Sequence, residues 1–335
     1  MIDYDNVTLV PRFLSRISSR ETIDTAVILN EHIKLQVPII ASPMPDVCSG
    51  DTAFRLKRSG VMGIIHRFQP IETQVKEFTF AISTPETASF EGRFDYGAVG
   101  CAIGVTDDYF ERYVALGNAG CSVFCIDIAN GFNTKIERVI DSFRSSPNKL
   151  FIIAGNVATQ EGYEYLANLG VDAVRVGIAG GSVCTTRQET GVYMPTLESV
   201  NECSQTFCSR PLIIADGGIR YPADMAKALA VGADMIMGGR IFAGYRESPG
   251  RYVKDRTTDK LYKLYRGAAS HGVQKETMNG EKPDYNEGAE ELVPFIDKSV
   301  ASVIKRFQNG LRSTMSYMGA SNIKEFKQNV RVELL

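Results

Sequence analysis

Short runs of consecutive apolar residues recur along the chain, and each run ends in small or polar residues before a stretch with helical periodicity. Continuous rather than alternating hydrophobicity is typical of strands that are buried on both faces of a parallel sheet. The eight runs are residues 37–44, 61–66, 98–104, 122–128, 151–157, 173–178, 212–215 and 235–238. Eight strands with helices between them predict a closed (β/α)8 TIM barrel, a fold of the α/β class.

An internal repeat supports this prediction. The segment 151–156 (FIIAGN) is similar to 213–218 (IIADGG). At the same offset along the chain, 170–177 (GVDAVRVG) is similar to 232–239 (GADMIMGG). Repeated strand-helix-strand units, with a helix over 222–230 between two of the strands, are typical of a right-handed parallel barrel. The alternative is a doubly wound open sheet, which usually has a G-x-G-x-x-G turn after its first strand, and the sequence has none.

Two regions fall outside the eight units. Residues 1–36 form an N-terminal arm, and residues 245–294 form a long polar segment that we interpret as a mobile flap. Helical periodicity returns over 295–318, where one stripe carries Ile296, Val300, Val303, Ile304, Phe307 and Leu311. We therefore interpret residues 1–335 as a single catalytic domain.

Composition and charge narrow the class of protein. The chain has 335 residues, 44% of them hydrophobic, and a net charge of −2 without a run of like charges. This balance argues against a nucleic-acid or membrane-surface partner. No apolar stretch approaches the roughly 20 residues of a membrane span, and residues 1–5 are polar, so we expect a cytoplasmic protein.

Cysteine and histidine usage limits the chemistry. Seven cysteines in a long chain indicate reduced thiols rather than a disulfide framework. Three widely separated histidines favour neither a transition-metal site nor a Ser-His-Asp triad. Cys121 and Cys125 lie four apart on a predicted strand, so we expect both to face one way into the core, joined by Cys101.

The active site of such a barrel lies in the loops after the strands, and phosphate usually binds after the seventh and eighth strands. Those loops contain Asp216-Gly217-Gly218 and Gly238-Gly239-Arg240. Glycines let backbone N–H groups approach an anion closely. The alternative is that they only form tight turns between strand and helix.

The loop after the sixth strand, 177–187 (GIAGGSVCTTR), holds a candidate nucleophile. Cys184 is surrounded there by small and polar residues, whereas a structural cysteine would have core residues as neighbours. A cysteine in a polar loop at the catalytic face can be reached by a substrate and activated by nearby dipoles.

The run GSVCTTR at 181–187, with Asp-Gly-Gly and Gly-Gly downstream, resembles the family of IMP dehydrogenase and GMP reductase. The likeness extends nearly from end to end, and it includes Ser19-Arg20, Ser42-Pro43-Met44, 65–68 (IHRF), 127–131 (DIANG), 154–157 (AGNV), 312–314 (RST) and 317–319 (YMG). In both enzymes the family cysteine attacks C2 of a purine nucleotide and forms a covalent intermediate.

Three features favour the reductase side of that family. Only residues 67–97 join the second and third strands, too few for the inserted regulatory module of most dehydrogenases. The part of the flap over 274–291 lacks an Arg-Tyr pair, and Asn286-Glu287-Gly288 within it resembles the reductase segment with an acidic catalytic residue. The Arg251-Tyr252 pair lies upstream of this part, and we interpret it as scaffold. The segment Tyr265-Arg266-Gly267 is instead dehydrogenase-like. The resemblance thus implies NADPH-dependent conversion of GMP to IMP and ammonia. An IMP dehydrogenase without the regulatory module, an inactive nucleotide-sensing barrel and a flavin-dependent barrel remain as alternatives.

The resemblance also implies roles for individual residues. The catalytic residues would be Cys184, Thr186 and Glu287, although most glutamates are solvated surface acids. The substrate would contact Ser182, Asp216, Gly217, Gly218, Gly238, Gly239, Gly267, Ala268, Asn286 and Gly288. The cofactor would contact Ser19, Arg20, Arg67, Asp127, Ala129, Asn156, Ser313 and Thr314. Because Ser19-Arg20 and Ser313-Thr314 resemble positions that act across a subunit boundary, a homotetramer is implied. Potassium would bind to the backbone of Ala179, Gly181 and Cys184.

Three departures from the family pattern bear on these roles. Ala179-Gly180 stands in place of Gly-Pro, which affects the carbonyls expected to bind potassium. Pro45-Asp46 interrupts the usual Met-Asp-Thr sequence, and Asp284 stands where relatives often have an arginine that contacts the base. A related purine nucleotide, including a deoxy form, therefore remains an alternative substrate.

Overall fold

Eight parallel strands close into a barrel in the computed structural model, which describes residues 1–335 except 12–13, 84–94, 107, 145, 147–148, 207–209 and 278–285. The strands neighbour one another in the order β10-β11-β12-β4-β5-β7-β8-β9. They are β4 (Ile39–Ala41), β5 (Met62–Ile65), β7 (Ala98–Ile103), β8 (Val123–Asp127), β9 (Phe151–Val157), β10 (Ala173–Val176), β11 (Leu212–Asp216) and β12 (Met235–Gly238). Each coincides with one predicted apolar run, so the (β/α)8 fold is confirmed.

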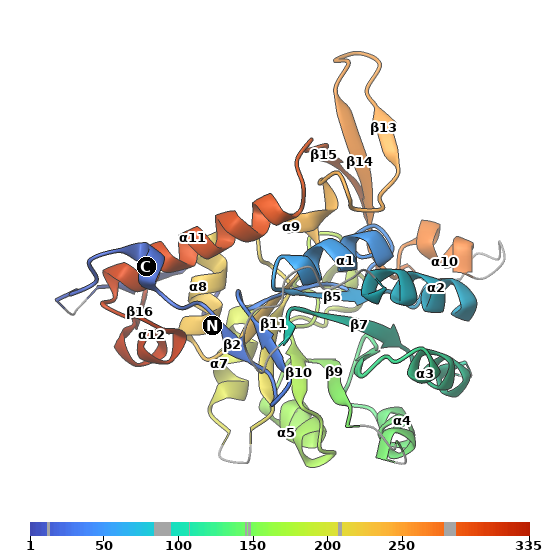
Figure 1. Cartoon of the computed structure of the whole chain (residues 1–335), viewed down its shortest axis with the longest axis horizontal. Helices are drawn as coiled ribbons and strands as arrows, with labels where there is room; N and C mark the ends of the chain where they lie inside the picture. The colour runs from blue at the N-terminus through green and yellow to red at the C-terminus, as the bar shows by residue number, and fades with distance from the viewer. Residues whose placement is uncertain are drawn as a thin grey trace.

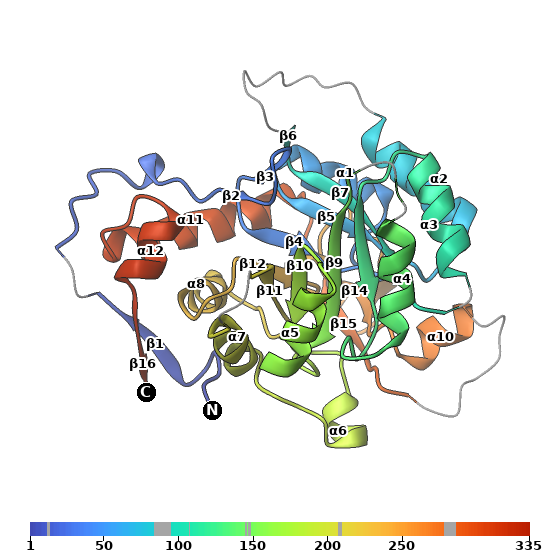
Figure 2. The ribbon, with the colours of Figure 1, turned by 90° about the horizontal axis from the view of Figure 1, so that it is seen from below.

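Helices surround the strands (Figure 2). They are α1 (Gly50–Arg58), α2 (Ile71–Ile82), α3 (Tyr109–Asn118), α4 (Lys135–Arg144), α5 (Gln160–Asn168), α7 (Thr196–Ser204), α8 (Pro222–Ala230) and α11 (Ala301–Tyr317), with the shorter α6 (Thr186–Thr190), α9 (Arg240–Ala243), α10 (His271–Thr277) and α12 (Ile323–Asn329). Helix α8 has the predicted bounds and begins at Pro222, where the missing N–H has no cost. Within the described residues, no helix combines the length and the apolar character needed to cross a membrane.

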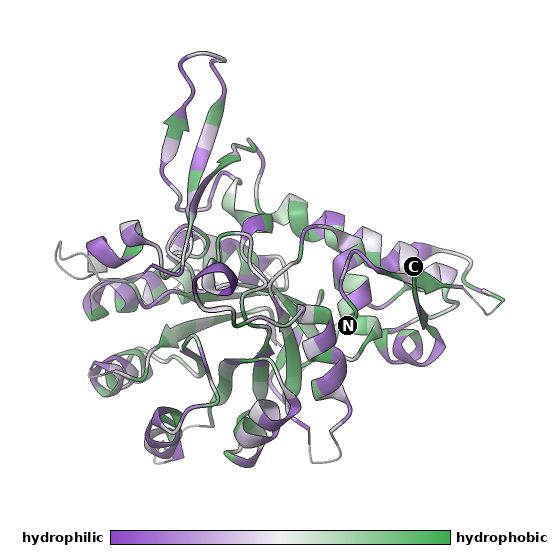
Figure 3. Cartoon of the chain, turned by 180° about the vertical axis from the view of Figure 1, so that it is seen from behind, coloured by the Kyte–Doolittle hydropathy of each residue, from purple (hydrophilic) through white to green (hydrophobic). Residues whose placement is uncertain are grey.

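The core has two apolar layers, one inside the barrel and one between the strands and the helices. Figure 3 shows the hydrophobic residues concentrated on the barrel strands. Cys125 belongs to the inner layer, whereas Cys121 and Cys101 belong to the outer layer. The prediction that Cys121 and Cys125 face one way is therefore wrong. Strand β8 begins at Val123, so the two-residue periodicity of a strand does not extend back to Cys121.

The N-terminal arm packs beside the C-terminus. Strand β1 (Val7–Val10) pairs antiparallel with β16 (Arg331–Leu334). A second small sheet consists of β2 (Val27–Ile28), β3 (Ile33–Leu35) and β6 (Asp95–Tyr96). Residues Arg20–Thr22 form a short 3-10 helix between the two sheets in sequence.

The segment interpreted as a flap contains regular structure. Its strands β13 (Tyr252–Lys254), β14 (Leu261–Arg266) and β15 (Glu290–Pro294) form an antiparallel sheet, and the β13–β14 hairpin projects away from the barrel (Figure 1). Lys263 is buried at the base of the hairpin, where its Nζ donates to the carbonyl oxygens of Tyr245 at 2.7 Å and Arg246 at 3.0 Å. Burial lowers the pKa of this ammonium group. Its hydrogen bonds anchor the sheet to the end of α9.

The predicted C-terminal helix begins later than expected. Helix α11 starts at Ala301, and Ile296 lies before it. The backbone N–H of Ile296 donates to the Gly244 carbonyl at 2.8 Å, which keeps this segment extended. The rest of the predicted stripe is buried, namely Val300, Val303, Ile304, Phe307 and Leu311.

Candidate active site

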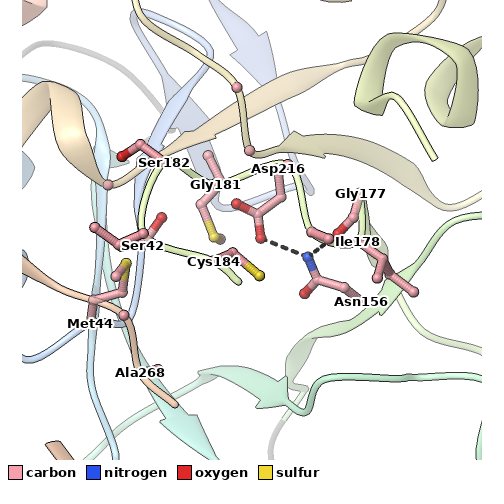
Figure 4. A pocket seen from close by; sticks show the side chains of 18 of the residues that line it. Ser42, Met44, Asn156, Gly177, Ile178, Gly181, Ser182, Cys184, Asp216 and Ala268 are labelled. Carbon is pink, nitrogen blue, oxygen red and sulfur yellow. Dashed lines mark hydrogen bonds between the residues drawn. The ribbon is translucent and has the colours of Figure 1, made fainter. Parts of the chain in front are cut away.

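A cavity of about 710 Å³ opens at the carboxyl ends of the barrel strands. Pockets of this size hold molecules of the size of a nucleotide. The predicted residues that line it are Arg67, Asp127, Ala129, Asn156, Ala179, Gly181, Ser182, Cys184, Thr186, Asp216, Gly217, Gly218, Gly238, Gly239, Gly267, Ala268 and Glu287. Figure 4 shows part of this set around the loop that follows β10.

Six predicted residues do not line this cavity. Asn286 and Gly288 flank Glu287, and Gly288 forms β-bridges with Cys184 and Ser270. The other four are Ser19, Arg20, Ser313 and Thr314. Arg20 lies over the ring of Tyr317 at 5.7 Å, on the side of the molecule where the N-terminal arm packs against α11. The departure noted at Asp284 lies outside the described residues.

Cys184 begins a chain of side-chain hydrogen bonds that joins two distant parts of the sequence. Its Sγ lies 3.3 Å from the Thr186 hydroxyl oxygen and donates to it. The Thr186 hydroxyl in turn donates to Glu287 Oε2 at 2.7 Å. A thiol, a hydroxyl and a carboxylate in this order can pass one proton between the sulfur and the carboxylate.

The backbone fixes this arrangement. The N–H of Cys184 donates to the Gly181 carbonyl at 3.2 Å, which closes a turn, and the N–H of Thr185 donates to the Glu287 carbonyl at 3.0 Å. The N–H of Ala289 donates to the Val183 carbonyl at 2.8 Å. The loop that carries Cys184 and the segment that carries Glu287 are therefore held together by main-chain hydrogen bonds on both sides of the thiol.

The loop around Cys184 is tightly packed. A Cβ atom at Gly180 would lie 2.4 Å from Thr196 Oγ1. The preceding residue, Ala179, has a φ of 61°, a left-handed conformation that is uncommon for a residue with a side chain. The expected Gly-Pro is Ala179-Gly180 in this chain, and position 180 has no room for a side chain.

Arg175 is a site residue that the sequence reasoning missed. It is buried on β10, and its Nη1 lies 2.5 Å from Asp127 Oδ1 while its Nη2 lies 2.8 Å from Asp216 Oδ2. Burial by itself lowers the pKa of this guanidinium, but the charges of Asp216 and Asp127 outweigh it and raise that pKa. The sequence does carry a signal for Arg175, because it is a charged residue within a run of apolar residues that predicts a strand.

Asn156 completes this polar layer. Its Nδ2 donates to the Gly177 carbonyl and to Asp216 Oδ2, both at 2.8 Å (Figure 4). Asp127, Asn156, Arg175 and Asp216 come from four neighbouring strands, β8 to β11. The floor of the cavity is therefore a continuous hydrogen-bonded layer.

Two buried tyrosines at the cavity were also missed. Tyr265 lies so near Gly239 that a Cβ atom there would be 2.6 Å from its hydroxyl oxygen. Tyr4 packs its ring against Gly218, and its buried hydroxyl has no hydrogen-bond partner. Burial raises the pKa of both phenols. Neither position carries a local sequence signal, because both are brought to the glycine loops by tertiary packing.

The charged side chains and backbone carbonyls at the cavity are compatible with the cofactor and the potassium ion that the sequence leads us to expect. Arg67 Nε lies 3.6 Å from Asp127 Oδ2, an ion pair in which this buried nitrogen makes no hydrogen bond. Within the described residues, no three His, Cys, Asp or Glu side chains gather to hold a metal ion. The carbonyl oxygens of Ala179, Gly181 and Cys184 are the kind of ligand that potassium takes.

Comparisons with known proteins agree with this geometry. The whole chain, residues 1–335, matches the family described as "IMP dehydrogenase / GMP reductase domain". It is 33% identical to inosine-5'-monophosphate dehydrogenase from Cryptosporidium parvum, with 99% of this chain and 92% of that protein covered. It is 34% identical to GMP reductase from Chromobacterium violaceum, with 98% and 96% covered. The structure of a GMP reductase variant from Trypanosoma brucei in complex with guanosine 5'-monophosphate superposes with a TM-score of 0.88 at 25% identity, covering 100% of this chain and 95% of that one.

Proposed function

Because the chain belongs to the IMP dehydrogenase / GMP reductase family of oxidoreductases, we propose that it is a GMP reductase, which converts GMP to IMP and ammonia with NADPH. Dehydrogenase and reductase relatives have similar sequence identity to this chain, so identity does not distinguish the two activities. The proposal therefore rests on the geometry of the site. The observation that carries it is the hydrogen-bond chain from Cys184 through Thr186 to Glu287.

This series of hydrogen bonds supplies the proton that deamination needs. A shift along it turns the Cys184 thiol into a thiolate and leaves its proton on Glu287. The thiolate adds to C2 of GMP, and the proton returns through Thr186 to the amine at C2. The amine then leaves as neutral ammonia, which is a far better leaving group than an amide anion. A thiol and GMP thereby give ammonia and a covalent thioimidate that joins Cys184 to C2, with no further proton required.

The second half of the reaction regenerates the thiol. NADPH, when bound, supplies the hydride that reduces C2. Release of IMP then breaks the bond between Cys184 and C2, and one proton from solvent restores the resting state of the relay. Cys184 serves as nucleophile and leaving group, Glu287 stores the proton, and Thr186 positions and transfers it.

The remaining lining residues bind the two ligands. Asp216 accepts hydrogen bonds from the ribose hydroxyls, while Ser182, Gly217, Gly218, Gly238 and Gly239 surround the phosphate. Gly267 and Ala268 lie beside the base, with Asn286 and Gly288 supporting Glu287. Arg67, Asp127, Ala129 and Asn156 face the nicotinamide.

Two further roles complete the proposal. Ser19, Arg20, Ser313 and Thr314, which do not line the cavity of their own chain, complete the cofactor site of a neighbouring subunit in a homotetramer. Potassium binds to the carbonyls of Ala179, Gly181 and Cys184. This potassium site would lie in the loop 177–187, whose turn holds Cys184.

The test follows absorbance at 340 nm. GMP with NADPH should give a decrease, with stoichiometric release of ammonia, and Cys184→Ser should abolish it. Cys203→Ser is the matched control, because Cys203 is buried on α7 away from the cavity. An increase with IMP and NAD would instead establish a dehydrogenase. No change with either pair would contradict both and indicate a nucleotide sensor.

A further inference from the structure

One carboxylate oxygen joins the two loops that are expected to bind phosphate. Ser182, in the loop after β10, donates its hydroxyl to Glu291 Oε1 at 3.2 Å. Arg240, directly after Gly238-Gly239 at the end of β12, donates its Nε to the same oxygen at 2.8 Å. Glu291 thus receives hydrogen bonds from residues that are distant in sequence and that meet only at the mouth of the cavity.

The register of the flap sheet directs Glu291 toward this place. Residue 291 on β15 pairs with Tyr265 on β14, and directly paired residues project to the same face of an antiparallel sheet. Tyr265 lines the cavity beside Gly239. The neighbouring Glu290 projects to the other face, where its Oε1 accepts the backbone N–H of Gly272 at 3.1 Å. Adjacent glutamates on one strand therefore have different surroundings.

A hydroxyl and a guanidinium that converge on one anionic oxygen are also a good arrangement for a phosphate oxygen. The Glu291 carboxylate occupies both of these donors. A phosphate and a carboxylate cannot share them, because two anions at contact distance repel each other.

We propose that Arg240 is a phosphate-binding residue of this site and that Glu291 is its internal competitor, which the 5'-phosphate of the nucleotide displaces. The inference rests on the proposed function in one respect, namely that the ligand is a nucleoside monophosphate. Glu291 then acts as a specificity residue, because only a ligand with a phosphate group can take both Ser182 and Arg240 from it.

The exposure of the pair allows this exchange. The side chains of Arg240 and Glu291 are 49% and 30% exposed, so their ion pair is screened by water and is weak. Rotation of the Glu291 side chain into solvent frees both donors without moving β15. Arg240 already lines the cavity and needs only to exchange one anionic partner for another.

The test measures dissociation constants by calorimetry on the full chain, without turnover. Glu291→Gln should bind GMP roughly three- to tenfold more tightly, since it removes the competing charge. Arg240→Met should weaken GMP binding by roughly tenfold or more. Guanosine, which lacks the phosphate, and NADP⁺, whose phosphates belong to the cofactor side, should bind both variants as they bind the wild type. Glu290→Gln is the matched control and should leave all three affinities unchanged.

The outcomes separate this inference from the proposed function. Unchanged or weaker GMP binding by Glu291→Gln would show that Glu291 only positions Ser182, and would overturn the inference alone. An equal loss of guanosine and GMP affinity in Arg240→Met would also overturn it. Tight GMP binding with no reductase activity would contradict only the proposed function. Failure of the wild type to bind GMP would contradict both.

Discussion

Arg175 contacts Asp216 at two points, with Nε at 3.1 Å and Nη2 at 2.8 Å from the same carboxylate oxygen. Its third nitrogen, Nη1, faces Asp127, so one buried guanidinium lies between two carboxylates. Asp216 belongs to the side proposed for the substrate and Asp127 to the side proposed for the cofactor. Arg175 therefore connects the two halves of the cavity beneath the reacting atoms.

Replacement of Arg175 should affect both halves. Arg175→Met leaves two partly buried carboxylates without their shared, buried counter-ion, and we expect a loss of about 3 kcal/mol in the free energy of unfolding. Arg175→Lys retains the charge but has one nitrogen in place of three, so its loss should be smaller while its KM values for GMP and NADPH both rise. Urea unfolding and steady-state kinetics measure these effects. Equal stability of Arg175→Met and wild type would show that the carboxylates do not depend on this residue.

The proton relay can be interrupted at two points. Glu287→Gln and Thr186→Val should each lower the rate of ammonia release by roughly 10²–10⁴-fold, because the departing amine loses its proton donor. Affinity for GMP should change little, since neither side chain is needed to hold the phosphate or the ribose. Rapid-quench measurement of ammonia in a single turnover gives this rate directly. Glu189→Gln, at an exposed position on α6, is the control and should react normally. Near-normal deamination by Glu287→Gln would remove the relay from the mechanism.

The barrel could be predicted from the sequence because strands buried on both faces are apolar at most positions. The flap sheet could not, since its strands carry many exposed polar residues and its buried lysine, Lys263, is paired with backbone carbonyls that no local pattern indicates. Arg175 was missed for a related reason, because the charge is compensated by residues on other strands. The pairing of Ser182 and Arg240 with Glu291 depends on the register between β14 and β15. That register is set by tertiary packing and has no local pattern.

The juxtaposition of Thr186 and Glu287 shows another limit. The two residues are 101 positions apart, and no spacing rule connects them. The family resemblance implied both roles, and the structure brings the two side chains into hydrogen-bond contact. Periodicity could place Cys184 in a loop at the catalytic face, but it could not identify the carboxylate that faces it.

His66 should make the stability of the fold sensitive to acid. Burial, followed by the charges of Arg112 and Arg266, lowers its pKa from 6.5 to about 4. The folded chain thus keeps this imidazole neutral between these values, while the unfolded chain protonates it. Stability from this group is complete above pH 6.5 and is lost as the pH falls toward 4, by about 3 kcal/mol.

The measurement compares urea unfolding of the wild type and His66→Phe from pH 7 to pH 4. Substitution should remove about 3 kcal/mol of the acid-induced loss. His32→Gln replaces an exposed histidine and should retain the pH dependence of the wild type. If His66→Phe loses as much stability as the wild type over this range, then acid destabilisation arises from other groups.

The close contact between Gly180 and Thr196 predicts a compensating pair of substitutions. In Gly180→Ala the new methyl group would lie 2.4 Å from Thr196 Oγ1, and we expect a loss of about 1–3 kcal/mol in the free energy of unfolding from this overlap. Thr196→Ala alone should cost little hydrogen bonding, because its buried hydroxyl has no partner. The double variant Gly180→Ala/Thr196→Ala should recover most of the lost stability, since the oxygen that overlaps is gone. Gly180→Ala/Thr196→Val should not recover it, because valine keeps a γ atom at that place. A Gly180→Ala/Thr196→Ala variant as unstable as Gly180→Ala alone would show that the methyl group is resisted by the backbone of the loop, and Thr196 would then have no part in setting the position of Cys184.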